Sequence, residues 1–255
     1  MIDTHCHMYS SELAPDLESV MERAEKAGVV KFYLPAIDKS TARQMFAVED
    51  RYPDRCFAMI GLHPCSVTAD FKSELEFIKL NLHQRKFSAI GETGLDFYWD
   101  VSFKEQQYEA LHEQAQLALQ YGLPLVLHTR NAMDETIDAI KHYKGRGLKG
   151  IFHCFGGTLS QAREIINLGF LMGIGGIVTY KNSELPAVLM EVDLAHIVLE
   201  TDAPYLPPVP YRGKRNESSY LVEVAKKIAA IKGLSLVEVV ETTTANAERL
   251  FANVM

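Results

Sequence analysis

Short apolar runs alternate with longer amphipathic stretches along most of the chain. The apolar runs are nearly continuous in hydrophobic residues, a pattern typical of strands that are buried on both faces of a parallel sheet. They predict strands over residues 2–7, 29–35, 56–62, 87–92, 123–128, 150–153, 169–173 and 197–200. The amphipathic stretches predict helices over residues 18–27, 41–51, 103–121, 132–143, 159–168, 219–231 and 236–251. Each remaining strand is followed by a loop with room for a helix.

This regular alternation predicts parallel strands joined by right-handed crossovers. The chain of 255 residues matches the usual size of a (β/α)₈ barrel, about 250 residues. No linker rich in Pro, Gly or Ser divides the sequence. We therefore expect one α/β domain over residues 1–255, folded as a TIM-type barrel. An open doubly wound sheet is the alternative, because strand order is not written in a single sequence.

The composition is that of an ordinary soluble globular protein, with 47% hydrophobic and 23% charged residues. A net charge of −7 argues against a broad basic surface, so a nucleic-acid partner would have to be gripped locally. No apolar run approaches the ~18 residues of a membrane span. The four cysteines show no C-x-x-C pair, so we expect reduced thiols. The first predicted strand begins at residue 2, and we expect a cytoplasmic protein without a signal peptide or membrane contact.

Several side chains with metal-binding chemistry lie at the carboxyl ends of predicted strands. His5 and His7 belong to one strand, in which residues i and i+2 point to the same face. The whole set is His5, His7, Glu92, His128, His153 and Asp202. Each alone could be a satisfied polar residue or a helix cap. In a barrel, however, these strand ends gather at one face, so the set predicts a metal centre.

Six ligands exceed the needs of one tetrahedral ion, so we expect two divalent cations, with Mg²⁺, Mn²⁺ and Zn²⁺ as candidates. Glu92 can bridge the two through its carboxylate oxygens. The remaining ligands divide into His5, His7 and Asp202 on one side, and His128 and His153 on the other. Such a pair of cations lowers the pKa of a shared water and polarises a phosphoryl or acyl oxygen. The predicted chemistry is hydrolysis, with Asp202 and Glu92 as catalytic residues and Asp202 as the proton acceptor.

Further carboxylates lie close to these ligands in the sequence. Asp3 and Glu200 are expected to orient ligating imidazoles by accepting their second N–H. Asp96 lies just past a predicted strand end, and the sequence gives it no role. Because ligation requires neutral histidines, we expect activity to fall below about pH 6.5.

The chain resembles the TatD family of metal-dependent hydrolases, in the amidohydrolase-like barrel superfamily. The matching segments are residues 2–7 (IDTHCH), 61–64 (GLHP), 90–98 (IGETGLDFY), 127–130 (LHTR), 153–157 (HCFGG), 200–206 (ETDAPYL) and 246–251 (NAERLF). The resemblance implies a (β/α)₈ fold and a dinuclear divalent-metal site at the six positions above. It also implies hydrolase activity, as a nuclease on DNA 3′ ends.

Three positions depart from the family pattern. The usual His-Pro-His reads His63-Pro64-Cys65, where His63 could still contact a substrate phosphate. Gly156 stands where the family has Ser, and residues 217–218 stand where it commonly has Pro. All three lie in loops expected to face the substrate, so they bear on substrate identity and leave the metal ligands unchanged.

Several residues near the predicted ligands suit contact with a phosphate chain. The planar fork of Arg130, two residues after His128, suits a phosphate, and a salt bridge to a neighbouring loop is the alternative. Arg212 and Arg215 lie in a basic loop after the last strand. This loop could bind a phosphate chain or simply be solvated, and the sequence favours neither reading. The aromatic residues 97–99 could stack on bases or pack as a lid.

The first hypothesis is a phosphodiesterase that acts as a 3′–5′ deoxyribonuclease on single-stranded ends. Its partner is a nucleic-acid 3′ end, held by His63, Arg130, Arg212 and Arg215. The second is an amide or ester hydrolase, because the same metals and water serve both reactions. A metal-storing or scaffold protein is the third, disfavoured because storage needs no proton acceptor beside an open site. The sequence indicates no obligate protein partner.

Overall fold

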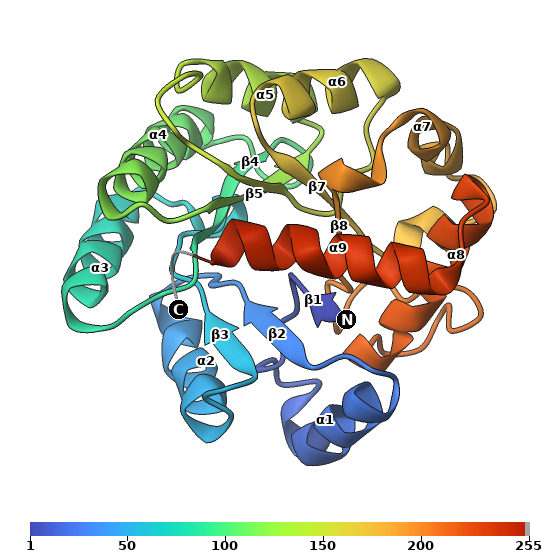
Figure 1. Ribbon diagram of the computed structural model, residues 1–255. Helices are drawn as coiled ribbons and strands as arrows, with labels where there is room; N and C mark the ends of the chain where they lie inside the picture. The colour runs from blue at the N-terminus through green and yellow to red at the C-terminus, as the bar shows by residue number, and fades with distance from the viewer. Residues whose placement is uncertain (253–255) are drawn as a thin grey trace.

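In the computed structural model, strands and helices alternate along the chain (Figure 1). The structure describes residues 1–252. The strands are β1 (Ile2–Asp3), β2 (Lys31–Leu34), β3 (Cys56–Ala58), β4 (Ile90–Asp96), β5 (Leu125–Arg130), β6 (Gly150–Phe152), β7 (Leu171–Ile174) and β8 (Ile197–Leu199). The helices are α1 (Leu17–Lys26), α2 (Lys39–Arg51), α3 (Phe71–Gln84), α4 (Lys104–Tyr121), α5 (Met133–Lys141), α6 (Leu159–Asn167), α7 (Leu185–Glu191), α8 (Leu221–Lys232) and α9 (Leu236–Phe251).

The strands are parallel and follow one another in chain order, β1-β2-β3 in one sheet and β4-β5-β6-β7-β8 in the other. Backbone hydrogen bonds link the two sheets at both seams. At one seam the Ser88 N–H donates to the Ala58 carbonyl at 2.8 Å, and at the other the Thr4 N–H donates to the Leu199 carbonyl at 3.0 Å. A doubly wound sheet reverses its strand order at a switch point, and this order does not reverse. The α/β barrel prediction is confirmed.

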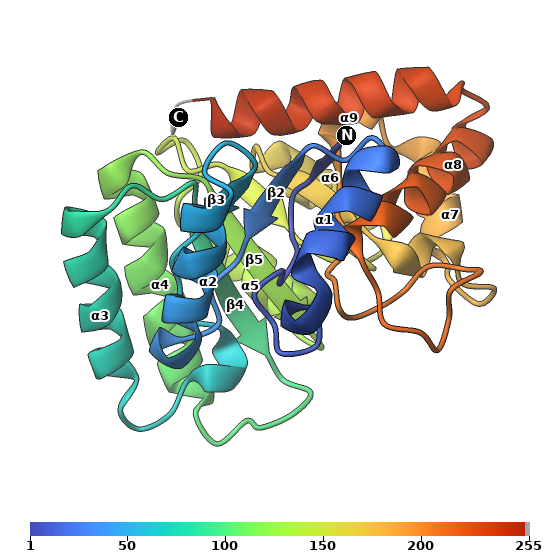
Figure 2. The ribbon, with the colours of Figure 1, turned by 90° about the horizontal axis from the view of Figure 1, so that it is seen from below.

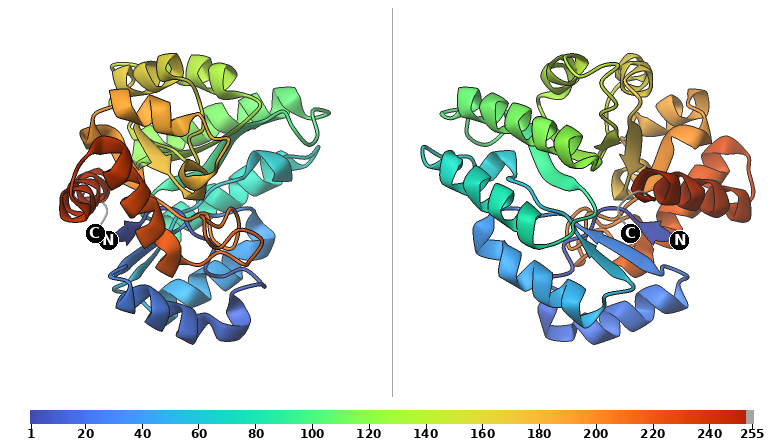
Figure 3. Two further views of the ribbon diagram at one scale, coloured as in Figure 1. Left: turned by 90° about the vertical axis from the view of Figure 1, so that its right-hand side faces the viewer. Right: turned by 60° about the vertical axis from the view of Figure 1, so that its left-hand side comes forward.

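The helices surround the ring of strands, and α9 lies across the end at which the strands begin (Figures 1, 2 and 3). The interior there is a buried apolar floor to which each strand, or a residue beside it, gives one side chain. These are Ile2, Tyr33, Met59, Ala89, Val126, Ile151, Leu171 and Val198. From α9, the Phe251 ring stacks on Tyr33 with centroids 3.8 Å apart, which seals the floor. No helix within residues 1–252 has the length and apolarity needed to cross a membrane.

Some boundaries differ from those predicted. Strand β1 ends at Asp3, and the chain continues through one isolated bridge between Cys6 and Ala203. Strands β4 and β5 continue to Asp96 and Arg130, past their expected ends. The α3 and α7 helices occupy stretches in which only loops were expected. The buried positions of α3 (Phe71, Leu75, Ile78, Leu82) have helical spacing, so its signal was present in the sequence.

Candidate metal centre

The candidate site lies directly above the apolar floor, one step further along the same strands. Side chains on a strand alternate between faces, so residues two positions apart share the interior. His128 follows Val126 by this spacing, His153 follows Ile151, and Glu200 follows Val198. The strand period therefore places apolar residues in one layer and ligand-type residues in the next.

Glu92 reaches the interior in a different way. The pairing of β4 with β5 shifts register between Ile90 and Thr93, as at a β-bulge. Such a bulge re-aims one side chain. The backbone N–H of Glu92 donates to the Ala36 carbonyl at 3.1 Å, across the seam between the two sheets. Its carboxylate, only 2% exposed, is thereby held among the imidazoles.

The two carboxylate oxygens of Glu92 face different histidines. On one side, Oε2 lies 3.0 Å from His5 Nε2 and 4.0 Å from His7 Nε2. On the other, Oε1 lies 2.8 Å from His153 Nε2 and 2.9 Å from His128 Nδ1. Burial alone would raise the pKa of Glu92, but the imidazoles around it, His153 foremost, lower that pKa well below its usual range.

Asp202 completes the side of the cluster that holds His5 and His7. Its Oδ1 lies 3.5 Å from His7 Nε2 and 3.7 Å from His5 Nε2. Burial would raise the pKa of Asp202, yet contact with His7 and the charge of His153 lower it. The carboxyl is therefore ionised near neutral pH and can accept a proton. The structure thus brings together all six side chains that the sequence singled out: His5, His7, Glu92, His128, His153 and Asp202.

Tyr9, which sequence reasoning did not single out, fixes the tautomer of His7. The Tyr9 hydroxyl donates its one proton to the Pro35 carbonyl at 2.6 Å. Its oxygen lies 3.0 Å from His7 Nδ1, so Nδ1 must carry the proton and donate. The lone pair of His7 is consequently on Nε2, which faces Glu92 and Asp202.

This arrangement fits divalent metal ions. The Nε2 lone pair of His7 and the two ionised carboxylates that it faces repel one another unless a cation lies among them. Within residues 1–252, both ring nitrogens of His5 and Nδ1 of His153 are buried without a hydrogen-bond partner. The ligand atoms of His5, His7 and Glu92 lie within 4.8 Å of one another, as do those of His5, His153 and Asp202. Imidazole and carboxylate are the donor set for ions such as Mn²⁺ and Zn²⁺.

His63 also joins the cluster, closer to the ligands than the sequence indicated. Its Nε2 lies 3.5 Å from Glu92 Oε1, and its ring atoms group with those of Glu92 and His128. Its Nδ1 accepts the Cys65 N–H at 3.0 Å, which places the proton of a neutral ring on Nε2. In this tautomer His63 offers an N–H into the site, which suits a phosphate oxygen better than a cation.

Asp96, to which the sequence gave no role, orients His128. Its Oδ2 lies 2.9 Å from His128 Nε2, so an N–H there leaves Nδ1 free to face Glu92. Burial would raise the pKa of Asp96, but the hydrogen bond with His128 lowers it. The only signal in the sequence was a carboxylate just past a predicted strand end.

Two further carboxylates, those of Glu200 and Asp3, are fully buried beside the cluster. Glu200 Oε1 accepts the Cys154 N–H and lies 3.5 Å from His153 Nδ1, close enough for an ion pair but without a hydrogen bond to that ring. Asp3 differs from the prediction, because its Oδ2 accepts hydrogen bonds from the hydroxyls of Thr201 and Ser218, both at 2.6 Å. Asp3 therefore fixes the backbone beside Asp202.

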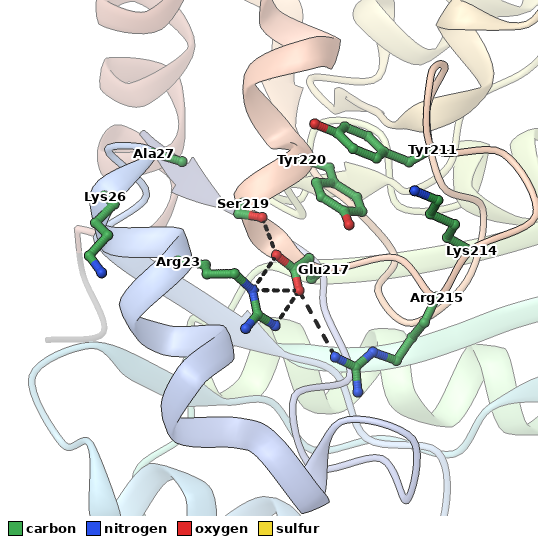
Figure 4. A pocket seen from close by; sticks show the side chains of 9 residues that line it. All are labelled: Arg23, Lys26, Ala27, Tyr211, Lys214, Arg215, Glu217, Ser219 and Tyr220. Carbon is green, nitrogen blue, oxygen red and sulfur yellow. Dashed lines mark hydrogen bonds and ion pairs between the residues drawn. The ribbon is translucent and has the colours of Figure 1, made fainter.

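The predicted basic substrate contacts have different surroundings. Figure 4 shows Arg215 beside Glu217, and its guanidinium donates to Asp16 at 2.6 and 2.9 Å. Carboxylates therefore already occupy the guanidinium of Arg215, which the sequence offered as a contact for phosphate. The Arg212 guanidinium lies 3.9 Å from the ring centroid of Tyr180. Arg130 forms no salt bridge within the described part of the chain and lies over two aromatic rings.

Comparison of the sequence with known proteins matches nearly the whole chain to one family. The sequence model of the TatD related DNase family matches residues 2–252. The chain is 38% identical over 253 residues to the uncharacterized metal-dependent hydrolase YabD of Bacillus subtilis, covering 98% of both chains. It is 32% identical over 257 residues to the 3′-5′ ssDNA/RNA exonuclease TatD of Pectobacterium carotovorum, covering 98% of this chain and 99% of the relative.

The fold comparison agrees with the sequence comparison. The crystal structure of YjjV, a TatD homologue from Escherichia coli, superposes with a TM-score of 0.92 and 31% identity, covering 99% of this chain and 98% of YjjV. These likenesses extend over the strands that carry the imidazole and carboxylate cluster. The chain therefore belongs to the TatD related DNase family of metal-dependent hydrolases.

Proposed function

We propose that this hydrolase is a phosphodiesterase that removes nucleotides from the 3′ ends of single-stranded DNA, at a centre that binds two divalent cations. The observation that carries the proposal is the division of ligands about Glu92, whose two carboxylate oxygens face separate sets of histidines. A carboxylate can bridge two cations in this way. The Pectobacterium relative is named as an exonuclease on single-stranded DNA and RNA, which favours a nucleic-acid substrate here.

The side chains of the site then divide into metal ligands, a proton acceptor and contacts for phosphate oxygens. One ion would be held by His5, His7, Glu92 and Asp202, and the other by Glu92, His128 and His153. When bound, two such ions supply positive charge for phosphoryl oxygens and lower the pKa of a water. Asp202, ionised and beside His7, accepts the proton of the attacking water. His63 offers its Nε2–H to the oxygens of the scissile and neighbouring phosphates, and so does the guanidinium of Arg130, which pairs with no carboxylate of residues 1–252.

The test is hydrolysis of an end-labelled single-stranded DNA oligonucleotide by protein stripped of metal and then reloaded with Mg²⁺, Mn²⁺ or Zn²⁺. Shortening from the 3′ end that requires metal is the expected result. Asp202→Asn keeps the size of the side chain but removes the proton acceptor, so its rate should fall about 10²- to 10⁴-fold. Lys226→Ala, a surface change on α8, is the matched control and should match the wild type.

The number of ions is tested separately by metal analysis and titration calorimetry. Glu92→Gln keeps the shape of the bridging side chain but loses its charge, so the bound metal should fall from two ions toward one. Two ions in the variant would count against a bridging Glu92. No cleavage by fully loaded, folded protein would refute the nuclease and favour the amide or ester hydrolase, for which acyl substrates are the next assay.

A further inference from the structure

The loop after β4 lies at the end of the barrel opposite α9 (Figure 2), and two large aromatic side chains of this loop are exposed to solvent. Tyr98 is 51% exposed and Trp99, the one tryptophan of the sequence, is 68% exposed. Single exposed aromatics are ordinary on a protein surface. Two adjacent ones, positioned by the same carboxylate that orients a ligand histidine, call for a specific explanation.

That carboxylate belongs to Asp96, which connects the loop to the centre. Its Oδ1 accepts the backbone N–H groups of Tyr98 at 2.9 Å and Trp99 at 3.2 Å. Its Oδ2 pairs with His128 Nε2 at 2.9 Å. Gln107 adds a further anchor, because its side-chain oxygen accepts the Asp96 N–H at 2.9 Å. The backbone that carries the aromatic pair is consequently tied to the histidine cluster.

Arg130 completes the arrangement from the neighbouring strand. Its backbone pairs with Asp96 across β4 and β5, and its carbonyl accepts the Phe97 N–H at 2.9 Å. The guanidinium carbon lies 3.9 Å from the ring centroid of Tyr98 and 5.1 Å from that of Trp99. Cation–π contact of this kind orients an arginine without consuming its N–H donors. The same side chain lines a pocket of about 430 Å³ beside Cys154 and Gly156.

We propose that Tyr98, Trp99 and Arg130 form a base-stacking platform for single-stranded nucleic acid, on which a nucleobase near the cleaved end lies against Trp99 while Arg130 holds the adjoining phosphate. The inference rests on the proposed nuclease function and names the part of the substrate that this loop recognises. Aromatic faces accept every base, and an arginine stacked against the same rings matches the alternation of base and phosphate along a strand. The platform thus provides local contacts that can hold a nucleic acid on a protein whose net charge of −7 does not attract it.

The chemistry of the platform favours a base over other occupants. An apolar peptide segment would leave the fork of Arg130 without an acceptor, whereas a nucleotide satisfies ring and fork together. Sugars stack on aromatic rings as well but carry no anion for the guanidinium. Double-stranded DNA keeps its bases stacked inside the helix, so the platform selects unpaired ends.

Trp99 itself reports the contact, because it is the only source of tryptophan fluorescence in the chain. Metal-loaded wild-type protein is titrated with a short phosphorothioate oligothymidylate, which resists hydrolysis. A matched abasic chain has the same sugar-phosphate backbone without bases. We expect the oligothymidylate to quench the fluorescence and the abasic chain to leave it nearly unchanged.

Affinities of labelled oligothymidylate for the variants are measured by fluorescence anisotropy. Trp99→Ala should weaken binding about 5- to 150-fold, the range that loss of one base–aromatic stack gives. Trp99→Phe should restore most of the affinity, since the smaller ring still stacks. Leu80→Ala removes a side chain of similar exposure, 60%, from α3 and should bind as the wild type does.

The outcomes separate the platform from the function on which it rests. Base-dependent quenching, with the loss in Trp99→Ala and its rescue in Trp99→Phe, supports the platform. If the wild-type protein cleaves unmodified single-stranded DNA and Trp99→Ala binds oligothymidylate with the wild-type affinity, the platform is overturned and the nuclease stays in place. Wild-type protein that neither binds nor cleaves overturns both.

Discussion

Gly173 in β7 leaves the space that the carboxylate of Glu200 fills. A Cβ built at Gly173 would lie 2.0 Å from Glu200 Oε2 and 2.6 Å from its carboxyl carbon. Heavy atoms in van der Waals contact lie about 3.5–4 Å apart, so Gly173→Ala must displace the carboxylate. Glu200 is fully buried and supports His153, which gives the displacement a route to the metal centre.

The cost has two parts. Overpacking of a dense core by one methyl group costs about 1–3 kcal/mol. For a chain of this size, each kcal/mol lowers the thermal midpoint by about 2–4 °C, so we expect a loss of about 2–12 °C. Loss of a side chain that orients a ligating histidine lowers the metal affinity about 10- to 100-fold. Thermal unfolding of the stripped protein and metal titration measure the two parts separately.

Gly175 provides a matched control on the same segment. A Cβ there would meet its nearest atom, the Glu200 carbonyl oxygen, at an ordinary 3.5 Å. Gly175→Ala should therefore keep the wild-type thermal midpoint or raise it slightly. Gly173→Ala with the stability and metal affinity of Gly175→Ala would refute the reasoning.

A double-mutant cycle identifies the clashing partner. In a Glu200→Ala background the carboxylate is absent, so adding Gly173→Ala should cost much less than it does in the wild type. An undiminished cost in that background would show that the methyl group clashes with something other than Glu200.

Three further predictions concern ion pairing, buried polar contacts and metal removal. Hydrogen bonds from Arg215 hold the pKa of Asp16 at about 2, below its ordinary 3.8, so the pair stabilises the fold above that ordinary pKa and loses its effect as pH falls toward 2. Asp16→Asn should therefore flatten the acid side of the stability profile, measured by urea unfolding between pH 6 and pH 2.5; an unchanged profile would contradict this. Fully buried Gln114 accepts the Leu62 N–H at 2.8 Å and donates to Thr93 at 2.7 Å, so Gln114→Leu should lose about 1–3 kcal/mol in urea unfolding, and a neutral result would refute the account. Metal stripping should lower the thermal midpoint and readdition should restore it, since ligands that bind only the folded state stabilise it; an equal midpoint in both forms would contradict the metal fit.

The strand periodicity explains how far the site was predictable. His128 and His153 each lie two residues after a buried apolar residue of their strand, and that spacing is local information. Glu92 breaks the spacing through a register shift in β4, which depends on pairing between strands and is not visible in one segment. Its identity as a ligand candidate was predictable, whereas its position between two sets of imidazoles was not.

The surroundings of the arginines were the least predictable feature. Arg215 pairs with Asp16, a residue 199 positions earlier in the chain. Nothing in the local sequence distinguishes an arginine that faces solvent or substrate from one already paired with a carboxylate. Arg130 is also an arginine, at the end of β5, yet no carboxylate pairs with it within the described residues.

The sequence by itself determined the alternation of strand and helix and the residues that carry the chemistry, because hydrophobic period and residue type are properties of short segments. Only the tertiary structure decided which groups meet. It placed Tyr9 against His7 and so put the His7 lone pair on Nε2, and it joined Asp96 to both His128 and the Tyr98 backbone. Tautomers, ion-pair partners and pKa values depend on contacts between distant segments, and those contacts exist only once the barrel has formed.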